Sequence, residues 1–596
     1  MISLVEKPEW ISMLLLYNLC LYSSRLTMRI FFNDSMYRNI FTTMTIAVIL
    51  FVCAGFSYGE TLSDQVTGHI EKRMKGAQIP EKIICVDGQV CKSFLVKNFY
   101  MERKFRPAWS DDFGPFPYVE DFLEVIRNAH LEGLRPEDYY LHKIELTLAG
   151  LYESLLSAKS PGIVNLAEFD LMLSDAFLLY ASHLLHGRVD HRNVYPGWVI
   201  YQRSADLTAI LHSALDSGEM EESLEELMPF HDGYAGLKGK LLMYRRIAAQ
   251  GGWPQIPQGT KMKKGSHGSR VALMRQRLSV TGDLVLARDQ TDNIFDVELE
   301  KAVKRFQERH GLKTDGTVGR STLEALNIPI GKRIQQIALN MDRMRWLPDD
   351  LGERYVFVNI ADFHLEVVED DREVMTMKII VGKHDWRSCV LSGKMTYLEL
   401  NPYWKVPDSI AEKEILPQVK KDPEYLEKKK IKMFRNWNDQ RKEIDPKTID
   451  WSRIRKKNFP YKFRQEPGPG NPLGRIKFIF PNECEIYLHD TPTRHLFGRP
   501  RRDFSHGCIR IEKPMELASY LLQDKKPWTR KKILAEIGKG TRQVVMISSP
   551  LDVHIFYGTA WVDRGGNLQF RNDIYHIDEV PYSLMSESAQ TAGALQ

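Results

Sequence analysis

One short segment in the last fifth of the chain combines residue types that can carry out nucleophilic catalysis. Cys508 lies in the run Ser-His-Gly-Cys-Ile-Arg at residues 505–510, nineteen residues after His489. A cysteine acyltransferase needs a thiolate, a proton acceptor near it and donors for the developing oxyanion. Because a free thiol has a pKa of about 8.5 and is mostly protonated at neutral pH, we predict Cys508 as the nucleophile and His489 as its general base.

The neighbours of Cys508 fit the other needs of acyl transfer. Gly507 has no side chain where the backbone must approach a carbonyl, and the N–H groups of Gly507 and Cys508 are candidate oxyanion donors. Arg510 points the same way as Cys508 if both lie on one strand, and its guanidinium suits a carboxylate. The candidate site is therefore Cys508, His489, His506 and Gly507 for catalysis, with Arg510, Ser505 and Tyr487 for substrate binding.

A mainly β domain is predicted to hold this site. Apolar residues alternate with a period of two in 355–360, 364–368 and 375–381, and strands resume at 475–480 and 485–488. A helix is predicted to begin near Pro514.

An insertion separates the two groups of predicted strands. Residues 411–464 are Pro-punctuated and basic, with 17 Lys or Arg against 9 Asp or Glu, and their pattern predicts helices. The simplest interpretation of such a charge run is a solvated face. The position just before the candidate site favours a lid that faces the substrate.

Two helical units precede the β domain. The first contains an amphipathic segment at 118–129 and a nearly all-apolar segment at 169–185, whose internal Asp170 and His183 favour a buried core helix over a membrane span. The second has three predicted helices, at 271–278, 297–310 and 320–326. The predicted division is 1–59 processing segment, 60–250 helical scaffold, 251–269 linker, 270–330 three-helix domain, 331–570 catalytic domain with insertion 411–464, and 571–596 disordered tail.

The N-terminal segment predicts export from the cytoplasm. An apolar run at 40–55 follows Arg38 and precedes small residues, which indicates a signal peptide cleaved before Glu60. A retained anchor, giving transient membrane association through this segment, stays open as the alternative. Export implies a periplasmic or cell-envelope location.

Five cysteines follow the predicted cleavage position, so at least one thiol must be unpaired. Cys85 and Cys91 flank a turn-like stretch and are candidates for a local disulfide in an oxidising compartment. Cys389 and Cys484 are expected to be two buried thiols.

The overall composition excludes several classes of protein. Hydrophobic residues make up 43% of the 596 residues and charged residues 27%, which is ordinary for folded domains and excludes a polytopic membrane chain. A net charge of +5 is small for this length, and we predict no nucleic-acid partner.

The block around Cys508 resembles the signature of the YkuD-type L,D-transpeptidases, a histidine followed by Ser/Thr-His-Gly-Cys and an Arg or Asn two positions on. The resemblance runs from about residue 354 to 560 and includes the segments 401–407 and 473–478. Residues 306–323, with Phe306, His310-Gly311 and Asp315-Gly316, resemble the helical peptidoglycan-binding domain. The domain order is most similar to the large YcbB-type subfamily and implies a multidomain α+β fold.

This resemblance implies peptidoglycan L,D-transpeptidation without a cofactor, with stem peptides and glycan as partners. Cys508 would attack the carbonyl between an L-centre of a diamino acid and the terminal D-alanine of a tetrapeptide stem. D-Alanine would leave with a proton from His489, and the amine of a neighbouring stem would resolve the thioester. If water resolves it, the same site is an L,D-carboxypeptidase. His506 is implied to shape the site.

Three other interpretations are open to test. His489, His506 and Cys508 offer metal ligands, with His495 nearby, but they lack the paired spacing of common zinc motifs. A non-catalytic wall-binding scaffold would need no intact block around Cys508. A serine penicillin-binding enzyme would need a Ser-x-x-Lys motif, which the sequence lacks.

Overall fold

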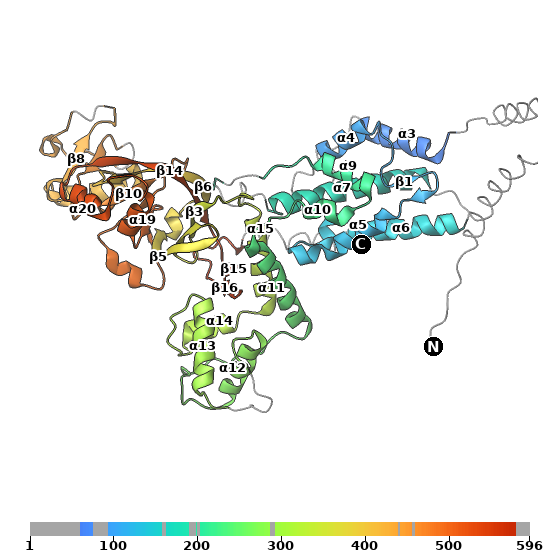
Figure 1. The fold of residues 1–596 in the computed structure, drawn as a ribbon, viewed down its shortest axis with the longest axis horizontal. Helices are drawn as coiled ribbons and strands as arrows, with labels where there is room; N and C mark the ends of the chain where they lie inside the picture. Colours follow the sequence, from blue (N-terminus) through green and yellow to red (C-terminus); the bar gives the residue numbers. More distant parts are fainter. Residues whose placement is uncertain are drawn as a thin grey trace, which may run out of the picture.

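The computed structural model describes residues 60–75, 93–157, 162–189, 198–199, 203–285, 293–438, 442–455 and 459–579. The predicted export segment and the predicted Cys85–Cys91 disulfide lie outside these residues. Figure 1 shows three parts: a bundle of helices, a small helical unit and a β-rich domain, with α11 (Asp232–Ala249) and α15 (Ile330–Met344) between them.

The first part is the predicted helical scaffold. Its elements are α3 (Leu62–Lys75), α4 (Ser93–Glu102), α5 (Tyr118–Arg127), α6 (Leu141–Leu156), α7 (Ile163–His186), α9 (Leu207–Ser217) and α10 (Met220–Glu225), with the short hairpin β1 (Ser110–Asp111) and β2 (Gly114–Pro115). The next helix, α11, belongs to the predicted scaffold in sequence but packs in a separate core. The core helix α7 buries Asp170, which accepts hydrogen bonds from the Tyr100 hydroxyl at 2.5 Å and the Trp109 N–H at 2.9 Å. Its polar groups are thus satisfied inside the bundle, as a core helix requires. None of the helices in the described ranges is both long and apolar enough to cross a membrane.

The second part is the predicted three-helix unit, made of α12 (Ser269–Val280), α13 (Val297–Arg309) and α14 (Arg320–Leu326). Phe306 and Leu323 are buried in its core, and Gly311 and Gly316 adopt left-handed conformations with φ of 61° and 70°. The predicted linker is partly built into this unit. Met262 is buried there and pairs with Val318.

The third part is a nine-stranded sheet with the strand order β12-β5-β13-β11-β10-β6-β14-β3-β4. Its strands are β3 (Arg354–Asn359), β4 (His364–Glu369), β5 (Arg372–Gly382), β6 (Leu391–Leu400), β10 (Ile476–Ile479), β11 (Leu488–His489), β12 (Asp503–Ser505), β13 (Ile509–Ile511) and β14 (Gln543–Phe556). The sheet closes on itself, because the first half of β5 pairs with β4 and the second half with β13. The helices α19 (Pro514–Leu521) and α20 (Arg530–Gly538) follow β13, and α19 begins at the predicted Pro514.

The insertion at 411–464 is not wholly helical, which differs from the prediction. After α16 (Asp408–Ile410), a π-helix (Ala411–Ile415), α17 (Leu416–Lys421) and α18 (Tyr425–Lys428), it forms β8 (Ile431–Phe434). The strand β8 joins β9 (Lys462–Gln465) and β7 (Trp404–Lys405) in a separate sheet. Leu416, Val419, Met433 and Phe463 form a core of their own beneath this sheet. The insertion is therefore a small packed subdomain.

Residues 571–579 correct the predicted disordered tail. Ile574, Tyr575 and Ile577 are buried in the core of the catalytic domain, and the Tyr575 hydroxyl donates to the Gly382 carbonyl at 2.9 Å. Just before them, β15 (Ala560–Val562) and β16 (Leu568–Phe570) pack against α11 and α15 (Ile330–Met344). This segment thereby ties the three parts of the chain together.

Candidate active site

Strand register places the predicted site residues on one face of the sheet. His489 on β11 pairs with Arg510 on β13, and Tyr487 and Cys508 come directly before the paired Leu488 and Ile509. Side chains of paired residues share a face, and alternate residues of a strand return to that face. Tyr487, His489, Cys508 and Arg510 therefore gather beside one another at the ends of two adjacent strands.

Cys508 is a partly exposed free thiol. Burial raises the pKa of the Cys508 thiol above its ordinary value. Hydrogen bonds from the backbone and hydroxyl of Tyr487, together with the charges of Lys477 and Arg510, act in the opposite direction. The resting thiol is thus neutral at physiological pH, and a base must take its proton during attack.

The orientation of His489 is set by its neighbour in sequence. Its Nδ1 lies 2.6 Å from the Asp490 backbone carbonyl. A carbonyl only accepts hydrogen bonds, so Nδ1 carries the hydrogen and Nε2 keeps its lone pair. Burial and the nearby charge of Arg510 lower the pKa of His489 to about 3. The imidazole is therefore neutral and able to accept a proton at Nε2.

The Asp490 carboxylate does not contact the imidazole; it supports the adjoining loop. It accepts a hydrogen bond from the Arg475 N–H at 2.9 Å and lies 3.4 Å from Nη1 of Arg494. It packs so closely on Gly474 that a Cβ there would come within 2.5 Å of it. Gly474 has φ of 63°. Glycine at this position therefore permits both the close approach of the Asp490 side chain and the left-handed backbone conformation.

Arg510 offers unused hydrogen-bonding capacity toward the site. Its Nη1 donates to Thr493 Oγ1 at 3.2 Å. Its Nε is buried and has no hydrogen-bond partner among the described residues. Several other buried arginines of the described residues also leave Nε without a hydrogen-bond partner, so this feature alone does not mark a ligand site.

Lys477 and Glu399 belong to the same face, although the sequence did not single them out. Lys477 on β10 pairs with His489 on one side and with Glu399 on β6 on the other. Its Nζ lies 3.7 Å from the centre of the Tyr487 ring. Burial lowers the pKa of Lys477, while Glu399 and Cys508 counteract that effect. The alternation of the predicted strand 475–480 was the signal that could have found this lysine.

The loop before Cys508 is held by its own hydrogen bonds. The Ser505 hydroxyl donates to the Cys508 carbonyl at 2.6 Å and accepts from the Gly507 N–H at 3.1 Å. Ser505 is buried, so its hydroxyl supports the loop; this differs from its predicted contact with substrate. The Gly507 N–H is likewise occupied, which leaves the Cys508 N–H as the oxyanion donor from this loop. Gly507 has φ of 116°, a conformation that favours glycine.

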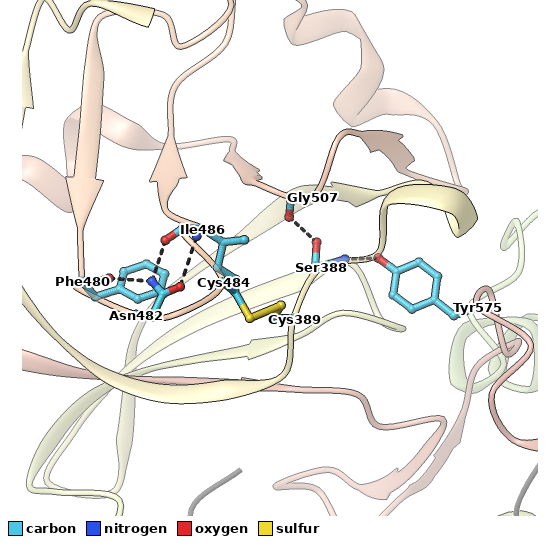
Figure 2. The surroundings of a disulfide bond; sticks show 8 residues. All are labelled: Ser388, Cys389, Phe480, Asn482, Cys484, Ile486, Gly507 and Tyr575. Carbon is cyan, nitrogen blue, oxygen red and sulfur yellow. Dashed lines mark hydrogen bonds between the residues drawn. A yellow bond between two sulfur atoms is a disulfide. The ribbon is translucent and has the colours of Figure 1, made fainter. Parts of the chain in front are cut away.

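A disulfide lies behind this loop and corrects the prediction of two buried thiols. Cys389 and Cys484 are bonded, with their Cα atoms 6.5 Å apart. The adjacent Ser388 donates through Oγ to the Gly507 carbonyl at 2.6 Å, and its N–H donates to the Tyr575 hydroxyl at 3.1 Å. Figure 2 shows how the disulfide and Ser388 lie together beneath Gly507.

Removal of this disulfide is expected to destabilise the catalytic domain. The bond links residues 95 positions apart, and loss of such a cross-link typically costs about 2–4 kcal/mol. The Cys389→Ala/Cys484→Ala variant should therefore unfold at lower denaturant concentration than the unaltered chain. Chemical denaturation with and without reductant measures this. An unchanged midpoint in the variant would show that the bond does not stabilise the fold.

His506 contacts the insertion instead of the other site residues named so far. Its Nε2 lies 2.6 Å from Oε1 of Glu414, which belongs to the π-helix of the insertion. The His506 ring packs on Trp386, with 4.6 Å between ring centres, and Lys413 Nζ lies 5.2 Å from the centre of that indole. The insertion therefore rests on the loop that carries Cys508.

The pH dependence of Cys508 alkylation should show how the neighbouring residues shift the pKa of the thiol. Burial raises its pKa, so the rate with iodoacetamide should climb with an inflection above the ordinary pKa of a free thiol. Lys477→Met and Tyr487→Phe each remove a group that lowers this pKa, so both should move the inflection to higher pH. Lys394→Met, on the distant part of β6, is the matched control and should leave it unchanged. Alkylation rates are measured across pH by stopped flow or mass spectrometry. An inflection near pH 6 would contradict this description.

The described ranges contain no group of three or more His, Cys, Asp or Glu side chains arranged to hold a metal ion. The three side chains that the metal hypothesis took as ligands each have another hydrogen-bond partner. Cys508 is hydrogen-bonded by Tyr487, His489 by the Asp490 carbonyl, and His506 by Glu414.

Three segments of the chain match known protein families. A model of the L,D-transpeptidase catalytic domain matches residues 353–545, which include Cys508 and His489. The chain carries an L,D-transpeptidase catalytic domain. A scaffold-domain model matches residues 95–241, and a model described as "Putative peptidoglycan binding domain" matches residues 267–326. The predicted order of domain types is thereby confirmed, and membership of the YcbB-type subfamily stays a prediction.

Two curated proteins are similar to parts of this chain. A "Putative L,D-transpeptidase" of Haemophilus influenzae is 36% identical over 266 residues, which cover 44% of this chain and 52% of that protein. The chain thus spans about half the length of this curated relative. The N-acetylmuramoyl-L-alanine amidase CwlM of Mycobacterium tuberculosis is 32% identical over 80 residues, covering 12% of this chain and 20% of that protein.

Solved structures of L,D-transpeptidases are only weakly similar to this chain. The one from Xylanimonas cellulosilytica is 16% identical with a TM-score of 0.17, covering 50% of this chain and 99% of that one. The one from Stackebrandtia nassauensis is 14% identical with a TM-score of 0.19, covering 51% and 96%. Likenesses of this size carry no argument about the site.

Proposed function

We propose that this chain is a peptidoglycan L,D-transpeptidase with Cys508 as its nucleophile. The observation that carries the proposal is the single sheet face on which the free thiol of Cys508 lies with neutral His489 and with Arg510, within the segment that matches the transpeptidase model. Peptidoglycan as the substrate is supported by that match and by the match of residues 267–326.

The first half-reaction forms a thioester. His489 Nε2 accepts the Cys508 proton as the sulfur attacks the carbonyl between the L-centre of the diamino acid and the terminal D-alanine of a tetrapeptide stem. The Cys508 N–H stabilises the oxyanion. The tetrahedral intermediate then breaks its C–N bond, and D-alanine leaves with the proton returned by His489.

The second half-reaction releases the product. The side-chain amine of a neighbouring stem attacks the thioester, and His489 accepts a proton from this amine. The C–S bond then breaks to release the Cys508 thiolate, which takes the proton back from His489. The result is an L,D cross-link. Water in place of the amine gives a hydrolysed stem, so the same residues support L,D-carboxypeptidase activity.

Arg510 and Lys477 are proposed to recognise the donor stem. Arg510 pairs with His489 across β13 and β11, and its guanidinium is suited to hold a stem carboxylate beside Cys508. Lys477 adds positive charge beside Cys508 and Tyr487. Positive charge at this position also stabilises the thiolate that forms when the product leaves.

The insertion is proposed to act as a lid that excludes water from the thioester. Its contact with the site is the Glu414–His506 hydrogen bond. Glu414→Ala should raise the ratio of hydrolysis to cross-linking a few-fold, because a looser lid admits water. Glu424→Ala, in the same insertion but paired with Lys428, is the matched control. Product analysis by mass spectrometry measures the ratio, and equal ratios in both variants would mean that the insertion is only a solvated subdomain.

An extracytoplasmic location agrees with the Cys389–Cys484 disulfide, since such bonds persist in oxidising compartments. Export by a signal peptide in residues 1–59 is part of the proposal, and a retained anchor with transient membrane association through this segment is its alternative.

The function is tested with a defined donor. The chain from residue 60 onward is incubated with disaccharide-tetrapeptide, and products are resolved by mass spectrometry. Free D-alanine with a cross-linked dimer supports transpeptidation, and D-alanine with only hydrolysed stem supports the carboxypeptidase. Absence of D-alanine release from a folded chain would overturn both.

A further inference from the structure

The stem amine that attacks the thioester must lose two protons in the second half-reaction. An alkyl amine has a pKa of about 10.4, so it arrives as an ammonium ion and has no lone pair until one proton leaves. A second proton leaves once the new C–N bond has formed. His489 accepts only one of the two, and that proton returns to Cys508. The other proton needs a second acceptor.

The surroundings of His489 are unfavourable for an ammonium ion. The positive charges of Arg510 and Lys477 both act on His489 and on the Cys508 thiol. Like charges repel, so a cationic acceptor is disfavoured on this side of the thioester. A negative charge on another side of Cys508 would attract it.

His506 and Glu414 form a carboxylate–imidazole pair at the loop that carries Cys508. The Nε2 atom of His506 lies 2.6 Å from Oε1 of Glu414. An ionised carboxylate only accepts hydrogen bonds, so the neutral imidazole carries its hydrogen on Nε2 and keeps its lone pair on Nδ1. Among the described residues, Glu414 is the one hydrogen-bond partner of this ring. Nδ1 can therefore accept a proton, and the carboxylate stabilises the imidazolium that results.

The His506 ring is held in place and can still be reached. It packs on the Trp386 indole, with 4.6 Å between ring centres. The turn after Trp386 is tied to the catalytic loop, because Ser388 Oγ donates to the Gly507 carbonyl at 2.6 Å. The His506 side chain is 23% exposed and that of Glu414 is 48% exposed. Both groups can therefore meet an acceptor without a change in the loop.

The subdomain formed by the insertion and β7 borders Cys508 at two points. Glu414 contacts His506, which lies two residues before Cys508. The charge of Lys405 on β7 acts on Lys477, whose charge in turn acts on Cys508. The His506–Glu414 pair thus lies at the edge of the same site.

The π-helix of the insertion presents Glu414 to the loop. Such wide turns are rare and are found frequently at functional sites. Ala411 and Ile415 of this turn are buried in the core of the insertion, whereas Glu414 is exposed. The carboxylate completes the pair only while the insertion rests on the loop that carries Cys508.

We propose that His506, oriented by Glu414, is the base that converts the acceptor from an ammonium ion to a free amine. This inference rests on the proposed function and adds a second catalytic base, which acts only in the second half-reaction. Water carries no positive charge and needs no such step. The pair therefore favours the amine over water as the acceptor.

The protons balance as follows. His506 Nδ1 takes one proton from the ammonium ion, and the nitrogen lone pair then forms the bond to the thioester carbon. His489 takes the second proton and passes it to the Cys508 thiolate when the C–S bond breaks. His506 releases the first proton to solvent.

The test compares two acceptors that differ in protonation. One is a tetrapeptide stem, whose side-chain amine is an ammonium ion at pH 7, and the other is hydroxylamine, which is mostly a free amine at this pH. The donor is a tetrapeptide whose side-chain amine is acetylated, so it cannot act as an acceptor. Mass spectrometry separates cross-linked stem, hydroxamate and hydrolysed stem.

The variants are His506→Gln, which removes the base, and Glu414→Gln, which removes the negative charge. The glutamine oxygen can still accept the Nε2 hydrogen, so Glu414→Gln keeps the contact between the insertion and the loop. Glu424→Gln, in the same insertion but paired with Lys428, is the matched control.

The ratio of cross-linked to hydrolysed stem should fall about ten-fold or more in His506→Gln and several-fold in Glu414→Gln, because a general base typically contributes at least this much. The ratio of hydroxamate to hydrolysed stem should stay that of the unaltered chain, since hydroxylamine needs no base to free its lone pair. Glu424→Gln should keep both ratios. If His506→Gln does not fold, Glu414→Gln decides alone, because Glu414 is an exposed residue.

Equal losses with the stem amine and with hydroxylamine would overturn the inference, because the pair would then only hold the insertion in place. Unchanged ratios would also overturn it, because another base or solvent would then deprotonate the acceptor. Either result leaves the proposed function standing as long as the unaltered chain is acylated at Cys508 and releases D-alanine. Absence of that acylation is the separate outcome that removes the proposed function.

Discussion

The Cys508→Ala variant is expected to fold normally and to lose acyl transfer to below detection. Covalent catalysis has no alternative nucleophile here, because Cys389 and Cys484 are joined in a disulfide and the Ser505 hydroxyl is bound to the loop. D-Alanine release from a tetrapeptide donor is the activity to measure.

The matched control for this variant is Ser388→Ala, which alters the support of the same loop without touching the nucleophile. It should lower stability and keep part of the activity. Thermal unfolding of both variants separates loss of fold from loss of chemistry. Retained D-alanine release by a well-folded Cys508→Ala protein would show that another residue is the nucleophile.

The His489→Ala variant is expected to form the acyl-enzyme about 10² to 10⁴ times more slowly, which is typical of a lost general base. The reason is that burial raises the pKa of Cys508, so the thiol ionises little without a proton acceptor at neutral pH. Because the pKa of His489 is about 3, the imidazole is neutral throughout pH 5–8 and the acylation rate of the unaltered chain should be nearly constant there. Single-turnover acylation followed by mass spectrometry measures both effects.

His506→Ala is the internal comparison, because His506 lies in the same block but contacts Glu414. It should slow acylation by far less than His489→Ala. At pH values above the raised pKa of the thiol, hydroxide ionises Cys508 directly, so alkylation of Cys508 in His489→Ala should approach that of the unaltered chain. An acylation rate within a few-fold of normal in His489→Ala at pH 7 would rule His489 out as the base.

Much of this architecture could be predicted from local patterns. The helices of the three-helix unit and the strands at 355–381 follow directly from periodic apolar residues, and α14 begins and ends at the predicted residues. The prediction that His489 acts with Cys508 came from the chemistry of a thiol nucleophile and from the family resemblance, and the register of β11 with β13 places the two residues on neighbouring strands. The periodic elements depend on residues near one another in sequence.

Features that depend on distant contacts could not be predicted in this way. To predict the Cys389–Cys484 bond, one must know that the start of β6 and the turn before β11 meet in space. Lys477 gains its place beside Cys508 only through the register of β10 with β11. The short strand β8 pairs with a partner some thirty residues later, so the basic run around it reads as helix when taken alone. The burial of Tyr575 likewise depends on its contacts with residues remote in sequence, such as Gly382 at the end of β5.

The central claim, that Cys508 carries the acyl group, is tested most directly by locating the acyl-enzyme. The unaltered chain is mixed with a tetrapeptide donor in the absence of an amine acceptor, quenched in acid, digested and mapped by tandem mass spectrometry. The claim predicts the mass of the donor acyl group, less D-alanine, on the peptide that contains Cys508 and on no other. An acyl group mapped to a different residue, or D-alanine release without any covalent intermediate on rapid quenching, would contradict it.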